Sequence, residues 1–562
     1  MSDVLDSLNA SQREAVLTMD RHVLVAAGPG TGKTLTIVRR ISHLIESGVA
    51  PADILAVTFT NRAAREMRDR VRAFMGAEGR GVFIGTLHLL GLRILKESGL
   101  ELKICSREEQ IRMVEAAAFC SANEARRVIE KISRVKGLME EPDEETARVL
   151  EAYQQMLREK SMCDFDDLIT MPLHVLEAGK GSCEFRHIIV DEYQDISLAQ
   201  YRLLRGIAGD RAWVCAVGDS DQAIYGFRGA DIRSFLNFSR DYGEAGVVVL
   251  KENYRSTKVI LDAAGALIRN NRLRIEKTLE ATGESGRPVH VISAPDEKAE
   301  ARLIVQEIEA RMGGTSFFRL DRQTVPTGFS EGAHSFSDFA VLFRTNGQAK
   351  ALQEAFLEWG IPCQVVGDRL PLRLEALIED ARAYAMGHET EGLDLEAVMA
   401  RVSEGASLST TEQAILTNLA AAYGDLPPEA ALDRAVEELS VLGAEDAFDP
   451  RGDAVALMTL HTAKGLEFKV VFVAGAEEGL LPLRFGRQET DMEEERRLLY
   501  VGMTRAKEEL FLTWARSRFL HGRALPGSPS PFLSEIPPGL VRTEALPGKP
   551  PKKGGKQMGL FG

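Results

Sequence analysis

The residues best suited to chemistry form a glycine-rich run near the N-terminus. Residues 23–34 read VLVAAGPGTGKT, in which an apolar stretch is followed by Gly28, Gly30, Thr31, Gly32, Lys33 and Thr34. The backbone N–H groups of such a loop can surround an oxyanion, and the start of the following helix adds partial positive charge. Lys33 can then reach the β- and γ-phosphates of a nucleotide, and the Thr34 hydroxyl can ligate Mg²⁺. The strict pattern has glycine where this chain has Ala27, a departure of one methyl group.

A pair of adjacent carboxylates, Asp191 and Glu192, closes the apolar run HIIV at residues 187–190. Ligands of parallel α/β sheets bind at the carboxyl ends of the strands, which is where this pair is expected. Asp191 is placed to hold Mg²⁺, and Glu192 is placed to orient and deprotonate an attacking water. Combined with the glycine-rich loop, the pair predicts hydrolysis of a nucleoside triphosphate.

Short apolar runs that alternate with helical segments are expected to position these groups. The first series of strands is predicted at residues 23–27, 54–60, 82–88, 184–195, 213–219 and 247–256. A second series is predicted at residues 287–295, 339–344, 455–460, 469–475 and 509–515. Such alternation is typical of parallel sheets that are covered by helices on both faces. Ser11 is the expected N-cap of the first helix.

Charge and cysteine content narrow the class of protein. The net charge is −14, but residues 371–450 hold 17 Asp and Glu against 4 Lys and Arg, so this segment alone carries −13. Basic grooves therefore remain possible elsewhere. Six cysteines without a CxxC pair favour reduced thiols in a cytoplasm over structural zinc. The sequence shows no apolar run long enough to cross a membrane and no signal peptide.

Six motifs that occur in order resemble those of one family. They are the glycine-rich loop, VDEYQD (190–195), VGDSDQAIYGFRGAD (217–231), LKENYRS (250–256), LMTLHTAKGLEF (457–468) and EEERRLLYVGMTRA (493–506). Together they are similar to superfamily 1 DNA helicases of the UvrD/Rep/PcrA type, over roughly residues 8–370 and 452–537. The resemblance implies a P-loop NTPase with two RecA-like motor domains, helical insertions, and the cofactors ATP and Mg²⁺.

The resemblance also implies domain boundaries. Motor domain one is expected at residues 1–105 and 181–275, with a helical insertion at 106–180. Motor domain two is expected at residues 276–370 and 451–537, interrupted by a short acidic helical insertion at 371–450. Relatives carry a longer domain there that touches duplex DNA, and we expect the acidic version not to bind duplex in that way. Residues 538–562, rich in Pro, Gly and Lys, are predicted to form a disordered tail.

For the nucleotide, the resemblance implies roles for six further residues. Gln12 would read the adenine edge and Tyr254 would stack on the base, while Gln222 would sense the γ-phosphate. Arg255 and Arg505 would act as arginine fingers, and Glu467 would touch the nucleotide from the second motor domain. Because Lys33 and Arg505 lie in different predicted domains, hydrolysis would require the cleft between those domains to close. The family commonly has arginine directly after its GKT, where this chain has Leu35, so base stacking is expected to be one-sided.

For DNA, the resemblance implies aromatic platforms and polar contacts to a single strand. The expected contacts are Phe59, Asn61, Thr86, His88, Tyr225, Phe227, Arg228 and His461, together with His521 at the pin that separates a duplex. Tyr225 and Phe227 lie in a polar loop beside glycine and arginine, which favours an exposed platform over a core position. Relatives usually have tryptophan at Phe227 and an aromatic at His521.

The function implied is an ATP-dependent 3′–5′ DNA helicase and single-stranded DNA translocase in DNA repair or replication restart. It would act on single strands and on junctions between single-stranded and duplex DNA. Gln557, Leu560 and Phe561 resemble the short peptide by which bacterial proteins dock on the sliding clamp. The alternatives are a translocase that strips proteins and unwinds weakly, and a non-catalytic scaffold bound to the clamp or to DNA. A helicase–nuclease subunit is disfavoured because the sequence offers little room for a nuclease domain.

Overall fold

A computed structural model describes residues 2–76, 78–100, 102–179, 184–243, 245–313, 334–366, 452–484, 490–520 and 523–547, with single positions between 397 and 448. The chain divides into two compact units. Unit 1 contains Met1–Ser256 and Asn271–Gly283, and unit 2 contains Thr257–Asn270, Glu284–Val365 and the C-terminal segment from Pro450. No helix within the described ranges is long and apolar enough to cross a bilayer.

Unit 1 is built on a parallel sheet with the strand order β3-β2-β6-β7-β1-β8. Its strands are β1 (Val23–Ala27), β2 (Ile54–Thr58), β3 (Phe83–Thr86), β6 (His187–Val190), β7 (Trp213–Gly218) and β8 (Gly246–Leu250). The predicted first series of strands is therefore confirmed as one six-stranded sheet. β1 and β6 are buried along their whole length, which explains their continuous apolar sequences.

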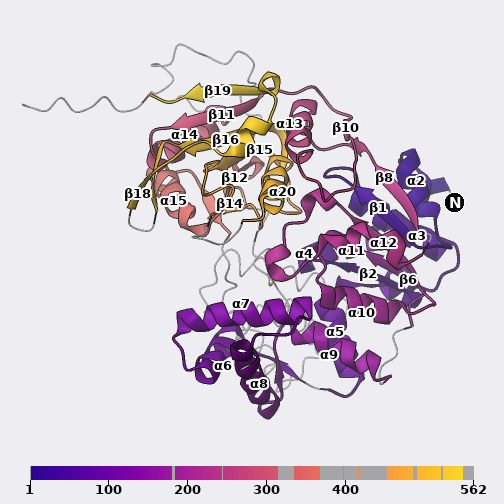
Figure 1. Cartoon of the computed structure of the whole chain (residues 1–562). Coiled ribbons are helices and arrows are strands. Elements are labelled where there is room, and N and C mark those ends of the chain that lie inside the picture. Colours follow the sequence, from indigo (N-terminus) through magenta and orange to yellow (C-terminus); the bar gives the residue numbers. More distant parts are fainter. Residues whose placement is uncertain are drawn as a thin grey trace, which may run out of the picture. The chain divides into compact units, whose positions relative to one another are not determined.

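Helices cover both faces of this sheet (Figure 1). One face packs against α3 (Lys33–Glu46) and α4 (Asn61–Met75), and the other against α5 (Leu87–Glu97), α9 (Asp167–Glu177) and α10 (Leu198–Ala208). Side chains of β1 alternate between the two cores, since Val23 and Val25 join one and Leu24 and Ala26 join the other. Unit 1 also contains α1 (Ser2–Leu5), α2 (Ala10–Leu17), α11 (Ile232–Leu236), α12 (Phe238–Asp241), β9 (Glu252–Asn253) and β10 (Glu280–Ala281).

The predicted helical insertion forms a group of its own within unit 1 (Figure 1). Its helices α6 (Arg107–Ala118), α7 (Ala122–Leu138) and α8 (Glu144–Glu159) share a core that includes Val114, Ile129 and Tyr153. The short strands β4 (Lys103–Ile104) and β5 (Met162–Cys163) pair in parallel where the chain enters and leaves this group. The group is joined to the sheet through α9, which packs closely on α5.

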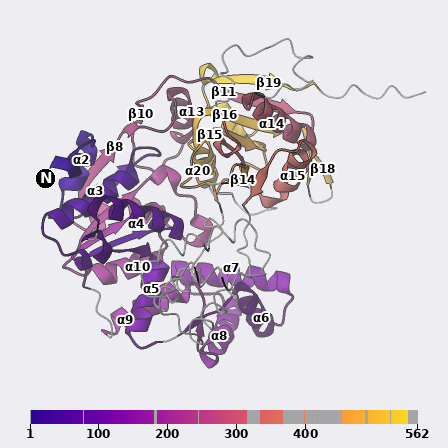
Figure 2. The same cartoon turned by 180° about the vertical axis from the view of Figure 1, so that it is seen from behind.

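Unit 2 is built on a second parallel sheet with the strand order β13-β14-β12-β15-β16-β11-β19. These strands are β11 (Val289–Ala294), β12 (Phe339–Phe343), β13 (Cys363–Val365), β14 (Val455–Thr459), β15 (Phe468–Ala474), β16 (Ala506–Ala515) and β19 (Val541–Ala545). α14 (Glu297–Arg311) and α15 (Ala349–Glu358) lie side by side on one face (Figures 1 and 2). α13 (Lys258–Ile268) packs against α20 (Met492–Met503), and β17 (Ser517–Leu520) pairs with β18 (Arg523–Pro526).

Three expectations are corrected by these elements. Asn9, rather than Ser11, caps α2, because its side chain accepts the Gln12 N–H in a capping box. The predicted tail cannot start at residue 538, since β19 adds a strand beside β11. The chain was expected to pass between domains once near residue 275, but it does so at residues 257, 271 and 284, because α13 packs with unit 2 while residues 271–283 pack on unit 1. Most of the acidic segment 371–450 lies outside the described residues.

Candidate nucleotide and nucleic-acid site

The glycine-rich loop has a backbone that only glycine can adopt without strain. Gly30 and Gly32 have φ of +65° and +79°, in the left-handed region. A Cβ on Gly30 would lie 2.5 Å from Cβ of Arg255, and one on Gly32 would lie 2.6 Å from Nε2 of Gln12. Ala27 is the last residue of β1 and is fully buried, so its methyl group is accommodated in the core before the loop begins.

Side chains outside the loop hold its carbonyl groups in place. The Gln12 amide donates to the Thr31 carbonyl at 3.0 Å, and the Asn253 amide donates to the Pro29 carbonyl at 2.6 Å. The backbone N–H of Tyr254 donates to the Gly30 carbonyl at 2.9 Å. Residues far apart in sequence therefore fix the loop shape. Gln12 is 2% exposed, whereas the Tyr254 ring is 53% exposed and offers a face for stacking.

Lys33 and Glu192 meet at the edge of the sheet. Their Nζ and Oε1 atoms are 2.9 Å apart, although 159 positions separate them in sequence. Burial opposes the charged ammonium, but Glu192, Asp191 and Asp219 together raise the pKa of Lys33 above its ordinary value. Glu192 has φ of +51°, a strained conformation for a residue with a side chain. The glycine-rich loop and the carboxylate pair, which were predicted separately from the sequence, are thus joined by the ion pair between Lys33 and Glu192.

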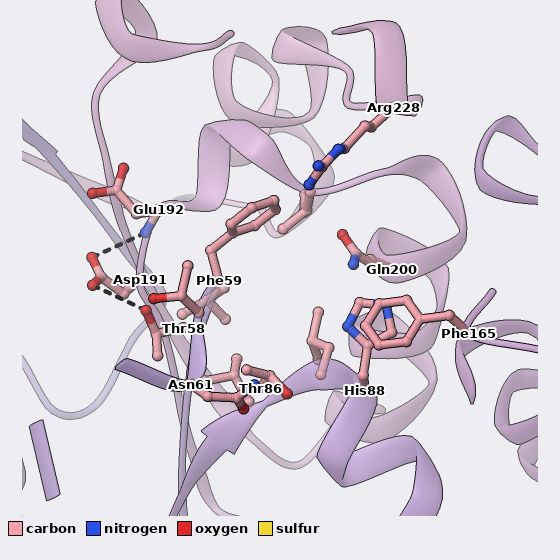
Figure 3. A pocket seen from close by; sticks show the side chains of 15 residues that line it. Thr58, Phe59, Asn61, Thr86, His88, Phe165, Asp191, Glu192, Gln200 and Arg228 are labelled. Carbon is pink, nitrogen blue, oxygen red and sulfur yellow. Dashed lines mark hydrogen bonds between the residues drawn. The ribbon is translucent and has the colours of Figure 1, made fainter. Parts of the chain in front are cut away.

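Asp191 lies next to this pair at the end of β6. Its Oδ1 accepts the Glu192 N–H at 3.0 Å, and its Oδ2 faces the Thr58 hydroxyl at 3.5 Å (Figure 3). Thr34 occupies the first turn of α3, directly after Lys33. A carboxylate and a hydroxyl are oxygen donors of the kind that Mg²⁺ takes when phosphate oxygens and water complete its shell. The donor set, the glycine cradle and the start of α3 fit a magnesium nucleotide.

A pocket of unit 1 brings five of the nine predicted DNA contacts together with the two carboxylates. It is lined by Phe59, Asn61, Thr86, His88 and Arg228, and by Asp191 and Glu192 (Figure 3). Phe59 and Asn61 follow β2, and His88 stands in the first turn of α5 after β3, so neighbouring strand ends supply them. Burial and the nearby Arg228 lower the pKa of His88 to about 3, which leaves the ring neutral.

Phe165 also lines this pocket and was missed by the sequence prediction. Its ring is 40% exposed and stacks on His88 with the ring centroids 3.9 Å apart. It belongs to the acidic run CDFDD at residues 163–167, at the boundary of the helical insertion. An aromatic within a run of carboxylates was the available signal, but nothing local indicated that this run returns to the sheet.

The two aromatics predicted as platforms differ in exposure. Phe227 is 57% exposed, as a platform requires. Tyr225 is only 2% exposed, and its ring stacks on Phe59 at 4.7 Å, so the expectation of an exposed ring is not met there. The Thr86 hydroxyl accepts the Leu89 N–H as the N-cap of α5, and Thr86 is 3% exposed.

The predicted residues of unit 2 are placed within that unit. Arg505 is 1% exposed, and its guanidinium donates to the carbonyls of Val501 and Leu466. Glu467 is exposed and pairs with Lys507 at 2.7 Å. His461 follows β14 and is partly buried. His521, Gln557, Leu560 and Phe561 lie outside the described residues.

Comparison with known proteins agrees with the motifs. A family model described as the UvrD/REP helicase N-terminal domain matches residues 8–243, and the UvrD-like helicase C-terminal domain matches residues 248–381 and 410–517. The ATP-dependent DNA helicase PcrA of Staphylococcus aureus is 31% identical over 97% of this chain and 88% of its own length. The protein of that name from Staphylococcus epidermidis is 32% identical over 99% and 90%. The phosphate loop, the carboxylate pair and these matches show that the chain belongs to the UvrD/REP helicase family.

Proposed function

We propose that the protein is a DNA-dependent ATPase that moves 3′ to 5′ along single-stranded DNA and unwinds duplexes. The observation that carries the proposal is the meeting of Lys33 and Glu192 beside a pocket lined by five of the predicted DNA contacts. Relatives named as ATP-dependent DNA helicases support the same reading. A place in DNA repair or replication restart, in the bacterial cytoplasm, is part of this proposal.

In this reaction, Lys33 neutralises charge on the β- and γ-phosphates, and Glu192 orients a water and takes its proton as it attacks the γ-phosphate. Thr34 and Asp191 would hold Mg²⁺, which draws charge from the phosphate oxygens. Gln222 senses the γ-phosphate, and Arg255 and Arg505 neutralise charge on the transferring group. Arg505 must exchange its partners within unit 2 for phosphate oxygens, which makes it the group most dependent on a change of conformation.

The test measures ATP hydrolysis with and without oligo-dT, in the wild type and in Glu192→Gln. We expect DNA to stimulate the wild type, and the variant to lose about 10²–10⁴-fold in kcat while it still binds ATP, because a general base contributes that much. Equal hydrolysis with and without DNA, over several strand lengths and salt concentrations, would refute the proposal.

The direction of movement, and the choice between duplex unwinding and protein removal, are tested with different DNA substrates. Partial duplexes with a 3′ or a 5′ single-stranded tail should be unwound only from the 3′ tail. Displacement of streptavidin from a single strand without unwinding would identify a protein-stripping translocase instead.

For the proposed contact of Gln557, Leu560 and Phe561 with a bacterial sliding clamp, deletion of residues 557–562 should abolish clamp binding and leave the ATPase rate unchanged.

A further inference from the structure

A buried lysine outside every motif described above contacts the catalytic loops. Lys277 lies in residues 271–283, the segment that returns to unit 1 between two passages into unit 2. Its side chain is 2% exposed, and Nζ donates to Oδ1 of Asp219 and to Oδ2 of Asp221, both at 2.6 Å. The side chains of these aspartates are 0% and 1% exposed. A buried charged group at this depth needs its partners to remain in place.

Asp219 connects Lys277 to Glu192 through the side chain of Gln194. The backbone N–H of Asp219 donates to Oε1 of Gln194 at 2.9 Å, and Nε2 of Gln194 donates to Oε2 of Glu192 at 2.6 Å. The other oxygen of Glu192 accepts from Lys33. Gln194 is fully buried, and a Cβ on Gly218 would lie 2.3 Å from its Oε1, so glycine at position 218 leaves the room that this amide occupies.

Asp219 also accepts a hydrogen bond from the proposed γ-phosphate sensor. Nε2 of Gln222 donates to Oδ2 of Asp219 at 2.7 Å, while Lys277 occupies Oδ1. Although burial opposes its charge, the two aspartates raise the pKa of Lys277 above its ordinary value, so the lysine stays cationic. One carboxylate is therefore fixed by Lys277 on one side and shared with Gln222 on the other.

We propose that Lys277 is a positioning residue of the ATPase, which fixes Asp219 and, through Gln194, holds Glu192 in line for water activation. The inference rests on the proposed function. Without the ammonium, Asp219 keeps a buried charge with fewer partners, so the loop shifts and Gln194 no longer holds Oε2 of Glu192. Because misplacing a catalytic group by about 1 Å can cost about 100-fold in rate, the loss should appear in kcat.

Arg274 provides a matched control in the same segment. Its guanidinium forms two hydrogen bonds to Asp221, at 2.9 and 2.8 Å, and its side chain is 9% exposed. Both of these bonds go to Asp221, whereas Lys277 donates to Asp219 as well. Lys277→Met and Arg274→Met each remove a cation from Asp221, but only the lysine change is expected to disturb Asp219.

The experiment compares the full-length wild type with Lys277→Met, Arg274→Met, Gln194→Leu and the double variant Lys277→Met/Gln194→Leu. With saturating oligo-dT, Lys277→Met should lower kcat about 10- to 100-fold, with the KM for ATP and the Kd for a fluorescent ATP analogue within about twofold of the wild type. Arg274→Met should stay within about threefold in kcat. In the Gln194→Leu background, Lys277→Met should change kcat less than about twofold.

Several outcomes would overturn the inference. They are a wild-type kcat in Lys277→Met, an equal loss of kcat and of Tm in Lys277→Met and Arg274→Met, or an undiminished effect of Lys277→Met in the Gln194→Leu background. Lys277→Arg, which retains the positive charge, should recover part of the lost kcat. A wild type without DNA-stimulated hydrolysis would overturn the proposed function as well, so the two failures are distinguishable.

Discussion

A buried ion cluster in the helical insertion gives the most quantitative prediction. Nζ of Lys136, on α7, lies 2.6 Å from Oδ2 of Asp164 and 2.8 Å from Oδ1 of Asp167. The three side chains are 7%, 2% and 5% exposed. Lys136→Met removes the cation that both carboxylates share. Leaving a buried charge without its partner costs about 3–5 kcal/mol.

The expected consequence is local opening of the insertion. A loss of about 3 kcal/mol raises the opening equilibrium about 150-fold, since 1.36 kcal/mol corresponds to a factor of ten. Hydrogen exchange of the amides in α7 and α8 measures this opening in the full-length protein. Lys131→Met is the matched control, because Lys131 lies on the same helix but is exposed, and it should change stability by less than about 0.5 kcal/mol.

The sign of the pH dependence follows from Asp164. Burial raises the pKa of Asp164 to about 6, although Lys136 lowers it. Removing Lys136 raises this pKa further, and a protonated carboxyl carries no buried charge. The penalty in Lys136→Met should therefore shrink as the pH falls from 7 towards 5. Equal protection in Lys136→Met and Lys131→Met at pH 7, after correction for intrinsic exchange, would refute the reasoning.

Three further predictions follow from single positions. Phe227→Ala should weaken oligo-dT binding by about 1–3 kcal/mol, measured as Kd by fluorescence anisotropy, whereas Phe119→Ala, which removes a 95% exposed ring on the α6–α7 turn, should leave Kd unchanged. Burial and Arg228 lower the pKa of His88 to about 3, so its NMR signal, assigned with His88→Gln, should not shift between pH 5 and 8. The stability that this neutral histidine contributes is complete above about pH 6.5 and is lost as the pH falls towards 3. A titration midpoint of the His88 signal near 6.5 would contradict this prediction. Gly91→Ala places a Cβ 1.7 Å from the Leu168 carbonyl oxygen and should destabilise unit 1 by about 1–3 kcal/mol in thermal unfolding, whereas Gly206→Ala, with its nearest neighbour at 3.8 Å, should be neutral or stabilising.

The local sequence determined which segments form the two sheets and which loops carry chemistry. Fully buried parallel strands must be continuous apolar runs, so β1, β2 and β6 were visible as such, as was β7, which is buried after its first residue. The phosphate loop was visible because its left-handed backbone at Gly30 and Gly32 tolerates only glycine. The edge strands β13 and β19 were missed because both are only partly buried and their sequences, CQV and VRTEA, lack that apolar signature.

Only the tertiary structure decided which distant side chains meet. The Lys33–Glu192 pair spans 159 positions, and Asp221 and Lys277 are 56 apart. Phe165 reaches His88 because α9 packs on α5, where Gly91 leaves no room for a Cβ. Local periodicity records how each element is buried, whereas the choice of polar partner depends on how the strand ends and the returning segment pack in three dimensions. The sequence by itself therefore determined the chemistry available at the site, and packing decided which residues hold that chemistry in position.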